Sequence, residues 1–364
     1  MEFCTGRPKL VRTARLLATN RMITHRPRIA ITMGDPAGVG PEVCLRLLLH
    51  TPTLQECVPL IFGDATVLQR VADCCELGPL PRIITFAEWE RSPDQITEPT
   101  IVDFSDADSE QVTPGVVSEL TGRASYRYIK AAIEAATTGS VDAITTGPIN
   151  KKALNAAGIH YPGHTEIFAE ETQSDRICMM LTCDEITCSF VTTHVGYRDV
   201  PGLLTVDRIL EVIEISDTAM TQLRGRKPKL VVCALNPHAG EDGLFGDREE
   251  ERIITPAIDL ARGKGIQVEG PLPPDTAFLP DRRRNTDCFV CMYHDQGHIP
   301  LKALAFDVAV NITLGLPIIR TSVDHGTALD IAWQGKAEAT SMYEAVKLAA
   351  RLAVARCEPT ACHS

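Results

Sequence analysis

The sequence predicts an α/β protein with a largely parallel sheet and a second lobe. Strand-like and helix-like segments alternate along most of the chain, which is typical of βαβ units. With 364 residues, the chain is longer than one hydrophobic core usually serves, so two lobes are expected. Two β-rich runs flank Asp184 and Glu185 within residues 176–195. A hairpin there, in an otherwise parallel protein, indicates the second lobe.

Each element is expected from apolar periodicity and from the glycines and prolines that bound it. Residues 77–115 are rich in proline and acids and predict loops with short strands. Gly139 is placed to end a helix. The other expected elements are strands at 28–34, 58–64, 141–148, 229–237, 287–293, 308–315 and 318–324, and helices at 42–50, 65–75, 125–139, 205–223, 248–263 and 340–356.

The chain is expected to divide into an extension, a two-lobed body and a short tail. Residues 1–27 are basic and almost free of acids. They are expected to be disordered or not native: one reading is a transit-like peptide, and the other is an overextended translation start with Met22 as the natural beginning. The body spans 28–357, its second lobe is built mainly from about 150–300, and 358–364 form the tail.

Composition excludes several classes of partner. The formal charge of −11 argues against a nucleic-acid or anionic-membrane partner, and 5% aromatic residues give little surface for base stacking. No apolar run reaches the roughly 18 residues of a membrane span. The 13 cysteines are scattered and mostly lie in apolar runs, which suits reduced thiols and a cytoplasmic location.

Five of the ten histidines follow an apolar strand-like run or lie in the turn after it. In open α/β sheets, ligands bind at the carboxyl ends of strands. Any one of these histidines could be structural, but five in one setting favour a site. Imidazole is a common ligand of divalent ions, and three imidazoles with open positions indicate a catalytic metal. The five are His164, His194, His238, His294 and His325.

Two glycine-containing segments carry different amounts of information. "GDPAGVGPE" (34–42) lacks both the dinucleotide fingerprint and the lysine of a phosphate loop. "SVDHGTALDIAWQGKAEA" (322–339) resembles the adenosine-binding segment of isocitrate and isopropylmalate dehydrogenases. Together with "TTGPINK", "PGHTE", "TTHV", "LNPHAGEDGLFG", "GPLPPDTAF" and "YHDQGHIPLK", it resembles the 4-hydroxythreonine-4-phosphate dehydrogenase family in order over residues 28–356.

That resemblance implies a three-layer α/β/α fold like that of isocitrate and isopropylmalate dehydrogenases, with the active-site cleft between two lobes. It also implies a homodimer in which His294 of one subunit completes a metal site with His194 and His238 of the other. The metal would be zinc, magnesium or cobalt, and the cofactor NAD or NADP. The implied substrate-binding residues are His164, Thr165, Lys302, Asn311 and Arg320; Asp275, Asp295 and Lys302 would act in catalysis; and His325, Gly326, Thr327, Ala328 and Asp330 would bind the cofactor.

The implied reaction is oxidation of the C3 hydroxyl of a 4-phosphorylated four-carbon acid, followed by loss of CO2. The substrate would be 4-phosphooxy-L-threonine, as in pyridoxal phosphate synthesis, or D-threonate or D-erythronate 4-phosphate. A metal-dependent phosphohydrolase on the same scaffold is the alternative. Lys302 is the first choice for base or proton relay, and Arg320 suits a carboxylate or phosphate. His298 is expected to be a rim or packing residue, and Trp333 stands where relatives usually have glycine.

Overall fold

The structure, a computed structural model, describes residues 26–305 and 308–357. The predicted tail, and all of the predicted extension up to residue 25, lie outside the described residues. The strands are β1 Arg28–Thr32, β2 Val58–Gly63, β3 Arg82–Thr85, β4 Thr100–Asp103, β5 Ala143–Thr146, β6 Cys178–Thr182, β7 Thr187–Phe190, β8 Leu230–Cys233, β9 Val268–Leu272, β10 Cys288–Cys291, β11 Val310–Leu314 and β12 Arg320–Val323.

Helices connect most of these strands, as the alternation in the sequence predicts. They are α1 Gly40–Leu48, α2 Thr51–Glu56, α3 Ala65–Cys74, α4 Phe86–Arg91, α5 Glu119–Thr137, α6 Lys151–Ala156, α7 His164–Glu171, α8 Val200–Leu203, α9 Val206–Arg224, α10 Thr255–Gly263, α11 Pro274–Ala277, α12 Pro280–Arg284, α13 His294–Ala305 and α14 Thr340–Cys357, with short turns η1 Pro93–Gln95, η2 Pro237–Gly243, η3 Glu250–Ile254 and η4 Leu329–Ile331. In the described residues, no helix combines the length and apolar character needed to cross a membrane.

One sheet runs through both lobes. Its strand order is β3-β4-β2-β1-β5-β12-β11-β6-β7-β10-β8-β9. The predicted hairpin is present, because β6 pairs antiparallel with β7. The pairs β11–β12 and β11–β6 are antiparallel as well, whereas the remaining pairs are parallel. The parallel half that contains β1 and β5 therefore runs opposite to the parallel half that contains β7, β10 and β8.

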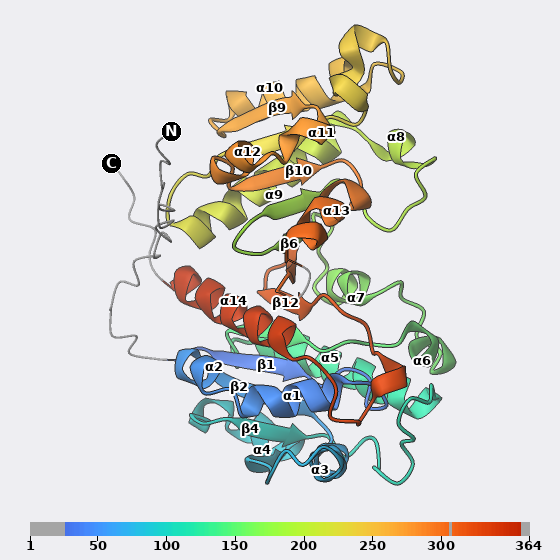
Figure 1. The fold of residues 1–364 in the computed structure, drawn as a ribbon. Coiled ribbons are helices and arrows are strands. Elements are labelled where there is room, and N and C mark those ends of the chain that lie inside the picture. Colours follow the sequence, from blue (N-terminus) through green and yellow to red (C-terminus); the bar gives the residue numbers. More distant parts are fainter. Residues whose placement is uncertain (1–25, 306–307, 358–364) are drawn as a thin grey trace, which may run out of the picture.

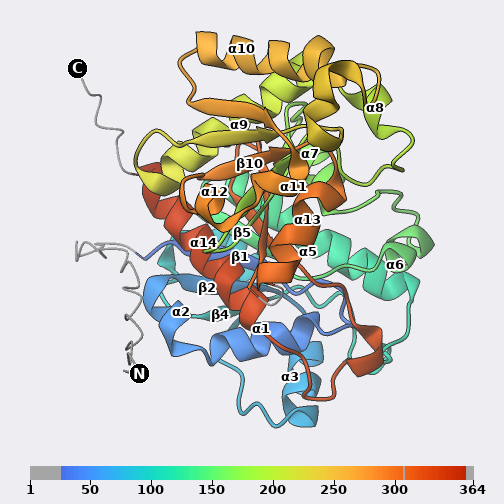
Figure 2. The ribbon, with the colours of Figure 1, turned by 45° about the horizontal axis from the view of Figure 1, so that its top comes forward.

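Helices cover both faces of the sheet, which gives the predicted three layers and two lobes (Figure 1). One apolar core surrounds β1, β2 and β5. Two others lie on opposite faces of the half that holds β8 and β10. The terminal helix α14 lies along the junction of the lobes in both ribbon views (Figure 2). It contributes Val346 to the first core and Leu348 to the second, so it packs the two lobes together.

The glycine-rich turn after β1 is hydrogen-bonded to the segment that follows β12, and we call this contact the clasp. The amide of Val39 donates to the carbonyl of Thr327 at 3.0 Å. The carboxylate of Glu42, which is fully buried, accepts from the amides of Gly335 at 3.2 Å and Ala337 at 3.0 Å. The turn thus holds a distant segment through main-chain contacts, which requires close backbone approach at Gly38.

Replacing Gly38 by alanine should loosen this clasp. A Cβ at Gly38 would lie 2.8 Å from the carbonyl oxygen of Thr327, and such overpacking costs about 1–3 kcal/mol. Urea denaturation should show that loss for Gly38→Ala. The matched control is Gly263→Ala in α10, where a Cβ meets nothing within 4 Å and a small gain in stability is expected. Equal stability of Gly38→Ala and the native chain would contradict the clasp.

Candidate active site

Three of the five histidines singled out in the sequence follow neighbouring parallel strands. His194, His238 and His294 come after β7, β8 and β10, and β10 pairs in parallel with both of the others. Because parallel strands end at the same edge of a sheet, the loops that carry these histidines leave from one edge. His325 follows β12 in the other half of the sheet, and His164 begins α7.

The structure brings His194 and His294 of one chain together. Their ring centroids lie 5.7 Å apart with an interplanar angle of 42°. Both rings line a cavity of about 260 Å³ together with Tyr197, Tyr293 and Asp295. The two imidazoles are therefore close enough to act on one ligand. The resemblance implies that His294 completes the site of a partner subunit, and within one chain its ring also lies beside that of His194.

Hydrogen bonds orient the ring of His294. Its Nδ1 lies 2.6 Å from Oδ1 of Asp295, and Oδ2 of Asp295 accepts from the hydroxyl of Tyr197. These contacts, that of Tyr197 first, lower the pKa of Asp295, so the carboxylate is charged and Nδ1 of His294 carries the proton. This contact directs Nδ1 toward Asp295 and leaves Nε2 as the ring nitrogen that can bind a metal.

His238 differs from the other two because it lies on a strained and exposed loop. It begins a run of six residues with positive φ, from His238 to Gly243, including φ 52° at His238 and 43° at Glu241. Residues other than glycine rarely adopt this conformation, which costs about 1–2 kcal/mol each. Nδ1 of His238 lies 3.2 Å from Oε2 of Glu241. Within the described residues no three metal-binding side chains cluster, so His238 is not brought to His194 and His294.

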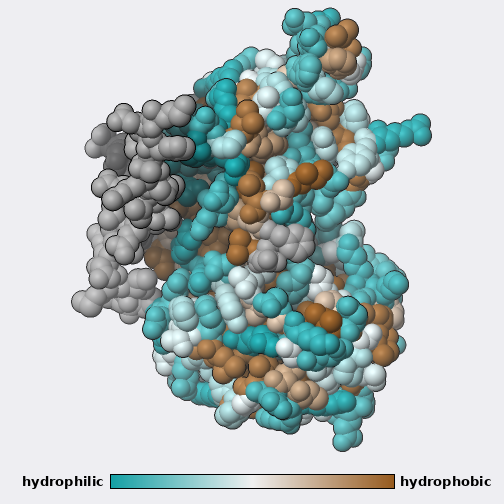
Figure 3. All heavy atoms as spheres, viewed as in Figure 1, coloured by the Kyte–Doolittle hydropathy of each residue, from teal (hydrophilic) through white to brown (hydrophobic). Residues whose placement is uncertain are grey.

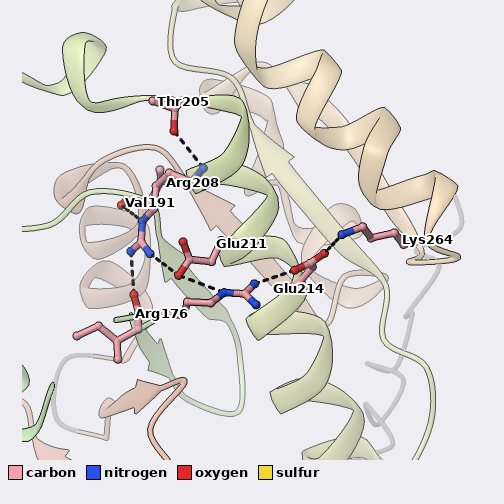
Figure 4. Close-up of polar contacts among 8 residues, drawn as sticks. Arg176, Val191, Thr205, Arg208, Glu211, Glu214 and Lys264 are labelled. Atoms are coloured by element: carbon pink, nitrogen blue, oxygen red, sulfur yellow. Dashed lines mark hydrogen bonds and ion pairs between the residues drawn. The ribbon is translucent and has the colours of Figure 1, made fainter. Parts of the chain in front are cut away.

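Helix α9 fixes the exit of β7, from which His194 departs. Arg208 donates from Nε to the carbonyl of Val191 at 3.2 Å and from Nη2 to that of Ile177 at 2.9 Å (Figure 4). Figure 4 also shows Glu211 and Glu214 of α9 holding Arg176, and Glu214 holding Lys264. The amide of Val191 donates to the carbonyl of Cys291, so this network ties the exits of β7 and β10 to each other.

A buried guanidinium marks a second part of the site. Arg320 on β12 is 3% exposed and donates to the hydroxyls of Thr313 at 3.0 Å and Thr146 at 2.7 Å. Among the described residues it forms no ion pair, and its Nε has no hydrogen-bond partner. Burial lowers the pKa of Arg320 to about 9, so it stays charged at pH 7. A buried charge with neutral partners is expensive unless an anion joins it.

Two further residues implied for the substrate present unpartnered polar atoms. Nε2 of His164 and Oδ1 of Asn311 are buried and have no hydrogen-bond partner in the described part of the chain. Asn311 is opposite Ser322 on β12, which puts it on the same sheet face as Arg320. Burial, and then the charge of Arg320, lower the pKa of His164 well below its usual value. Thr165, next to His164 in α7, is half-buried.

The charge of Glu166 connects this anion site with the histidine pair. Glu166 raises the pKa of Arg320, although burial outweighs it. It also raises the pKa of His194, which burial, His294 and Lys151 together lower. Glu166 therefore acts electrostatically on His194 and on Arg320, which lie in different halves of the sheet.

Lys302 and Asp275 contact different elements of the structure. Nζ of Lys302 on α13 pairs with Oδ2 of Asp324 at 3.1 Å, and Asp324 follows β12 directly. Asp275 is exposed on α11, which packs against η2, the segment that carries His238. Lys302 therefore bridges α13 to the end of β12, while Asp275 accompanies the His238 loop.

The residues implied for the cofactor border a larger cavity. His325, Ala328, Asp324 and Lys336 line a space of about 640 Å³. Nε2 of His325 is buried without a partner among the described residues. Thr327 sits in the clasp with the glycine-rich turn. Gly326 and Asp330 are exposed, on the solvent side of this segment.

Trp333 packs into the clasp in a backbone conformation that favours glycine. Its φ is 59°, which glycine adopts without strain. The indole is 5% exposed, donates from Nε1 to the carbonyl of Pro36 at 3.1 Å, and lies under the guanidinium of Arg70 at 4.9 Å. Side-chain packing here compensates for backbone strain.

The sequence alone did not identify Tyr197, Asp324 and Glu166 as parts of the site. Asp324 and Glu166 lie inside the quoted segments "SVDHG" and "GHTE", directly before His325 and two residues after His164. Their positions in these motifs were an available signal. Tyr197 has none beyond its place three residues after His194.

Comparison with known proteins places the chain among relatives. The family model described as "Pyridoxal phosphate biosynthetic protein PdxA" matches residues 55–349. The chain belongs to this family. It is 44% identical over 340 residues to the 4-hydroxythreonine-4-phosphate dehydrogenase of Trichlorobacter lovleyi, which covers 92% of this chain and 100% of that protein. It is 46% identical over 330 residues to the D-threonate 4-phosphate dehydrogenase of Salmonella typhimurium, covering 89% and 98%.

A solved structure agrees with these relatives. The crystal structure of 4-hydroxythreonine-4-phosphate dehydrogenase from Klebsiella pneumoniae superposes with a TM-score of 0.80 at 40% identity, covering 90% of this chain and 99% of that chain. The predicted family and fold are thereby confirmed. The predicted class of enzyme, a dehydrogenase and hence an oxidoreductase, is confirmed by the same relatives.

Phosphate binding should depend on the charge of Arg320. Burial lowers the pKa of Arg320, but a guanidinium keeps its proton in proteins. Calorimetry with inorganic phosphate at pH 8, where the phosphate is a dianion, should show a Kd about 10- to 100-fold higher for Arg320→Gln, because charge-assisted hydrogen bonds are lost. A Kd for folded Arg320→Gln equal to the native value would contradict this role.

Proposed function

We propose that the chain catalyses the NAD- or NADP-dependent, divalent-metal-dependent oxidation of the C3 hydroxyl of a 4-phosphorylated four-carbon acid, with loss of CO2. The observation that carries this proposal is the buried charge of Arg320, which donates to the neutral hydroxyls of Thr313 and Thr146, together with the unpartnered buried atoms of His164 and Asn311. Such a site suits an anionic ester or carboxylate. The substrate is 4-phosphooxy-L-threonine, which yields 3-amino-2-oxopropyl phosphate, or D-threonate or D-erythronate 4-phosphate, which yields dihydroxyacetone phosphate.

The donor set beside this anion site fits a divalent ion of the zinc, cobalt or magnesium type. His194 and His294 of one chain would hold it, with Asp295 fixing the tautomer of His294. His238, whose ring contacts Glu241, is the third ligand and would come from the other subunit, because it does not lie with His194 and His294 in the described residues of one chain. A bound divalent ion would lower the pKa of the substrate hydroxyl and stabilise the charge that develops during decarboxylation.

Lys302 and Asp324 are suited to handle the proton. The 3.1 Å pair lets Lys302 pass a proton to Asp324, which borders the larger cavity, and take the proton of the C3 hydroxyl in its place. Asp295 orients His294, and Asp275 supports the His238 loop. A nicotinamide cofactor would accept the hydride when bound, and its adenosine half would lie along His325, Gly326, Thr327, Ala328 and Asp330.

A homodimer would cover the apolar side chains that flank the histidines. Tyr197 is 66% exposed near His194, Leu244 is 70% exposed near His238, and Ile299 is 66% exposed on the helix of His294. Figure 3 shows apolar patches on the upper lobe, some of them close to its junction with the lower lobe. Exposed apolar groups around a polar site are typical of an interface. A second copy of the chain would bury these side chains in a homodimer that forms in the cytoplasm.

The relatives support both substrate classes. The Trichlorobacter lovleyi enzyme is named for 4-hydroxythreonine-4-phosphate and the Salmonella typhimurium enzyme for D-threonate 4-phosphate, at 44% and 46% identity. A substrate panel is therefore needed to determine whether the substrate carries an amine or a hydroxyl at C2. The phosphohydrolase alternative has no separate observation in its favour.

The substrate panel should identify the reaction. Protein with Co2+ and NAD or NADP should produce reduced nicotinamide with 4-phosphooxy-L-threonine or with D-threonate or D-erythronate 4-phosphate. Lys302→Ala should lower kcat by about 100-fold or more, because proton transfer is lost. The control is Lys347→Ala, a lysine paired with Glu344 on α14, which should keep the native rate. Inorganic phosphate without reduced nicotinamide would indicate the hydrolase instead.

The dimer should depend on Leu244. Light scattering should give the mass of two chains for the native protein and of one folded chain for Leu244→Asp, because the charge opposes burial of that surface. Leu260→Asp is the matched control, since Leu260 is 49% exposed on α10 and should leave the mass unchanged. A native protein with the mass of a single chain would contradict the homodimer.

A further inference from the structure

His298 lies one helical turn after His294 and stacks on its ring. The ring centroids of the two side chains are 3.6 Å apart and the planes differ by 9°. Nδ1 of His298 lies 2.9 Å from the carbonyl oxygen of His294. Because a carbonyl only accepts, Nδ1 of His298 carries a proton and donates it. This tether sets the plane of His298 parallel to that of His294.

His298 also packs on the strand that leads to His194. Its ring centroid is 4.6 Å from that of Phe190 in β7, and His298 is 6% exposed. Gly297 allows this close approach: a Cβ there would lie 2.8 Å from Cε1 of Phe190 and 2.9 Å from Sγ of Cys291. His298 therefore fills a slot between α13 and β7, the two elements that carry His294 and His194.

His294 is then held on an edge and on a face. Asp295 holds Nδ1 at one edge of the ring, and His298 covers one face. His194 lies at a larger distance, 5.7 Å between centroids. These two contacts restrict rotation of the His294 ring about χ2, so its Nε2 atom points in one direction.

We propose that His298 is a positioning residue that aligns His294 for the divalent ion. This inference rests on the proposed function of His294 as a metal ligand. A leucine at this position would fill the slot without a parallel ring, and a phenylalanine would stack without the tether to the carbonyl of His294. Only histidine supplies both a flat face and the Nδ1–H donor at this place. The sequence predicted that His298 is a rim or packing residue. Its burial is inconsistent with a rim position and agrees with packing.

Metal affinity tests this role directly. Calorimetry with Co2+ on the full chain should give a Kd about 10- to 100-fold higher for His298→Ala, the usual effect of losing a residue that orients a ligand. His298→Phe refills the slot and should fall between His298→Ala and the native protein. The visible spectrum of the Co2+ form should shift in both variants, which a purely structural role would not produce.

The matched control is another stacked histidine. His50 stacks on Tyr343 at 4.0 Å and 4°, outside the cavity that His194 and His294 line, so His50→Ala should keep the native Kd and spectrum. A native Kd and spectrum in folded His298→Phe and His298→Ala would overturn the positioning role. If His298→Ala does not fold, His298→Phe decides alone. A native protein that binds no Co2+ would instead overturn the metal site, and the positioning role with it.

Discussion

The parallel pairing of β7, β10 and β8 places their carboxyl ends at one edge of the sheet, and most of the site follows from this placement. The loop after each strand carries one histidine, and the central strand leads directly into α13 with His294 and Lys302. A shift of one strand in this order would separate His194 from His294. The antiparallel centre of the sheet is the second constraint, because it reverses the half with β5 and β12, so that Arg320 at the start of β12 lies toward the edge at which β7 and β10 end.

The anion site at Arg320 and the histidine pair have complementary electrostatics. Arg320 is a buried cation that donates to neutral hydroxyls, so its charge is available to an anionic ligand. The histidine pair is arranged for a cation, with Asp295 and Tyr197 ordering one ring. Glu166 acts electrostatically on both. A substrate with a phosphate at one end and a hydroxyl near the other end matches such a division.

Most helices and strands could be predicted from periodicity, because their apolar faces are continuous in the sequence. The residues of the site could be named from motifs, but their partners could not. Nothing near His294 in the sequence shows that Tyr197 reaches Asp295, since that contact depends on the pairing of β7 with β10. The left-handed run from His238 to Gly243 is equally hidden, because only Gly240 and Gly243 of these residues favour positive φ. Trp333 also has a positive φ although it is not glycine, and its packing under Arg70 compensates for the strain.

The proposed binding of one divalent ion by the rings of His194 and His294 is tested most directly by X-ray absorption at the zinc edge of zinc-loaded protein. We expect outer-shell scattering from at least two imidazole rings, and the loss of one ring in His194→Ala and in His294→Ala. A shell of oxygen atoms without imidazole scattering, or a spectrum that neither substitution changes, would contradict the site described above.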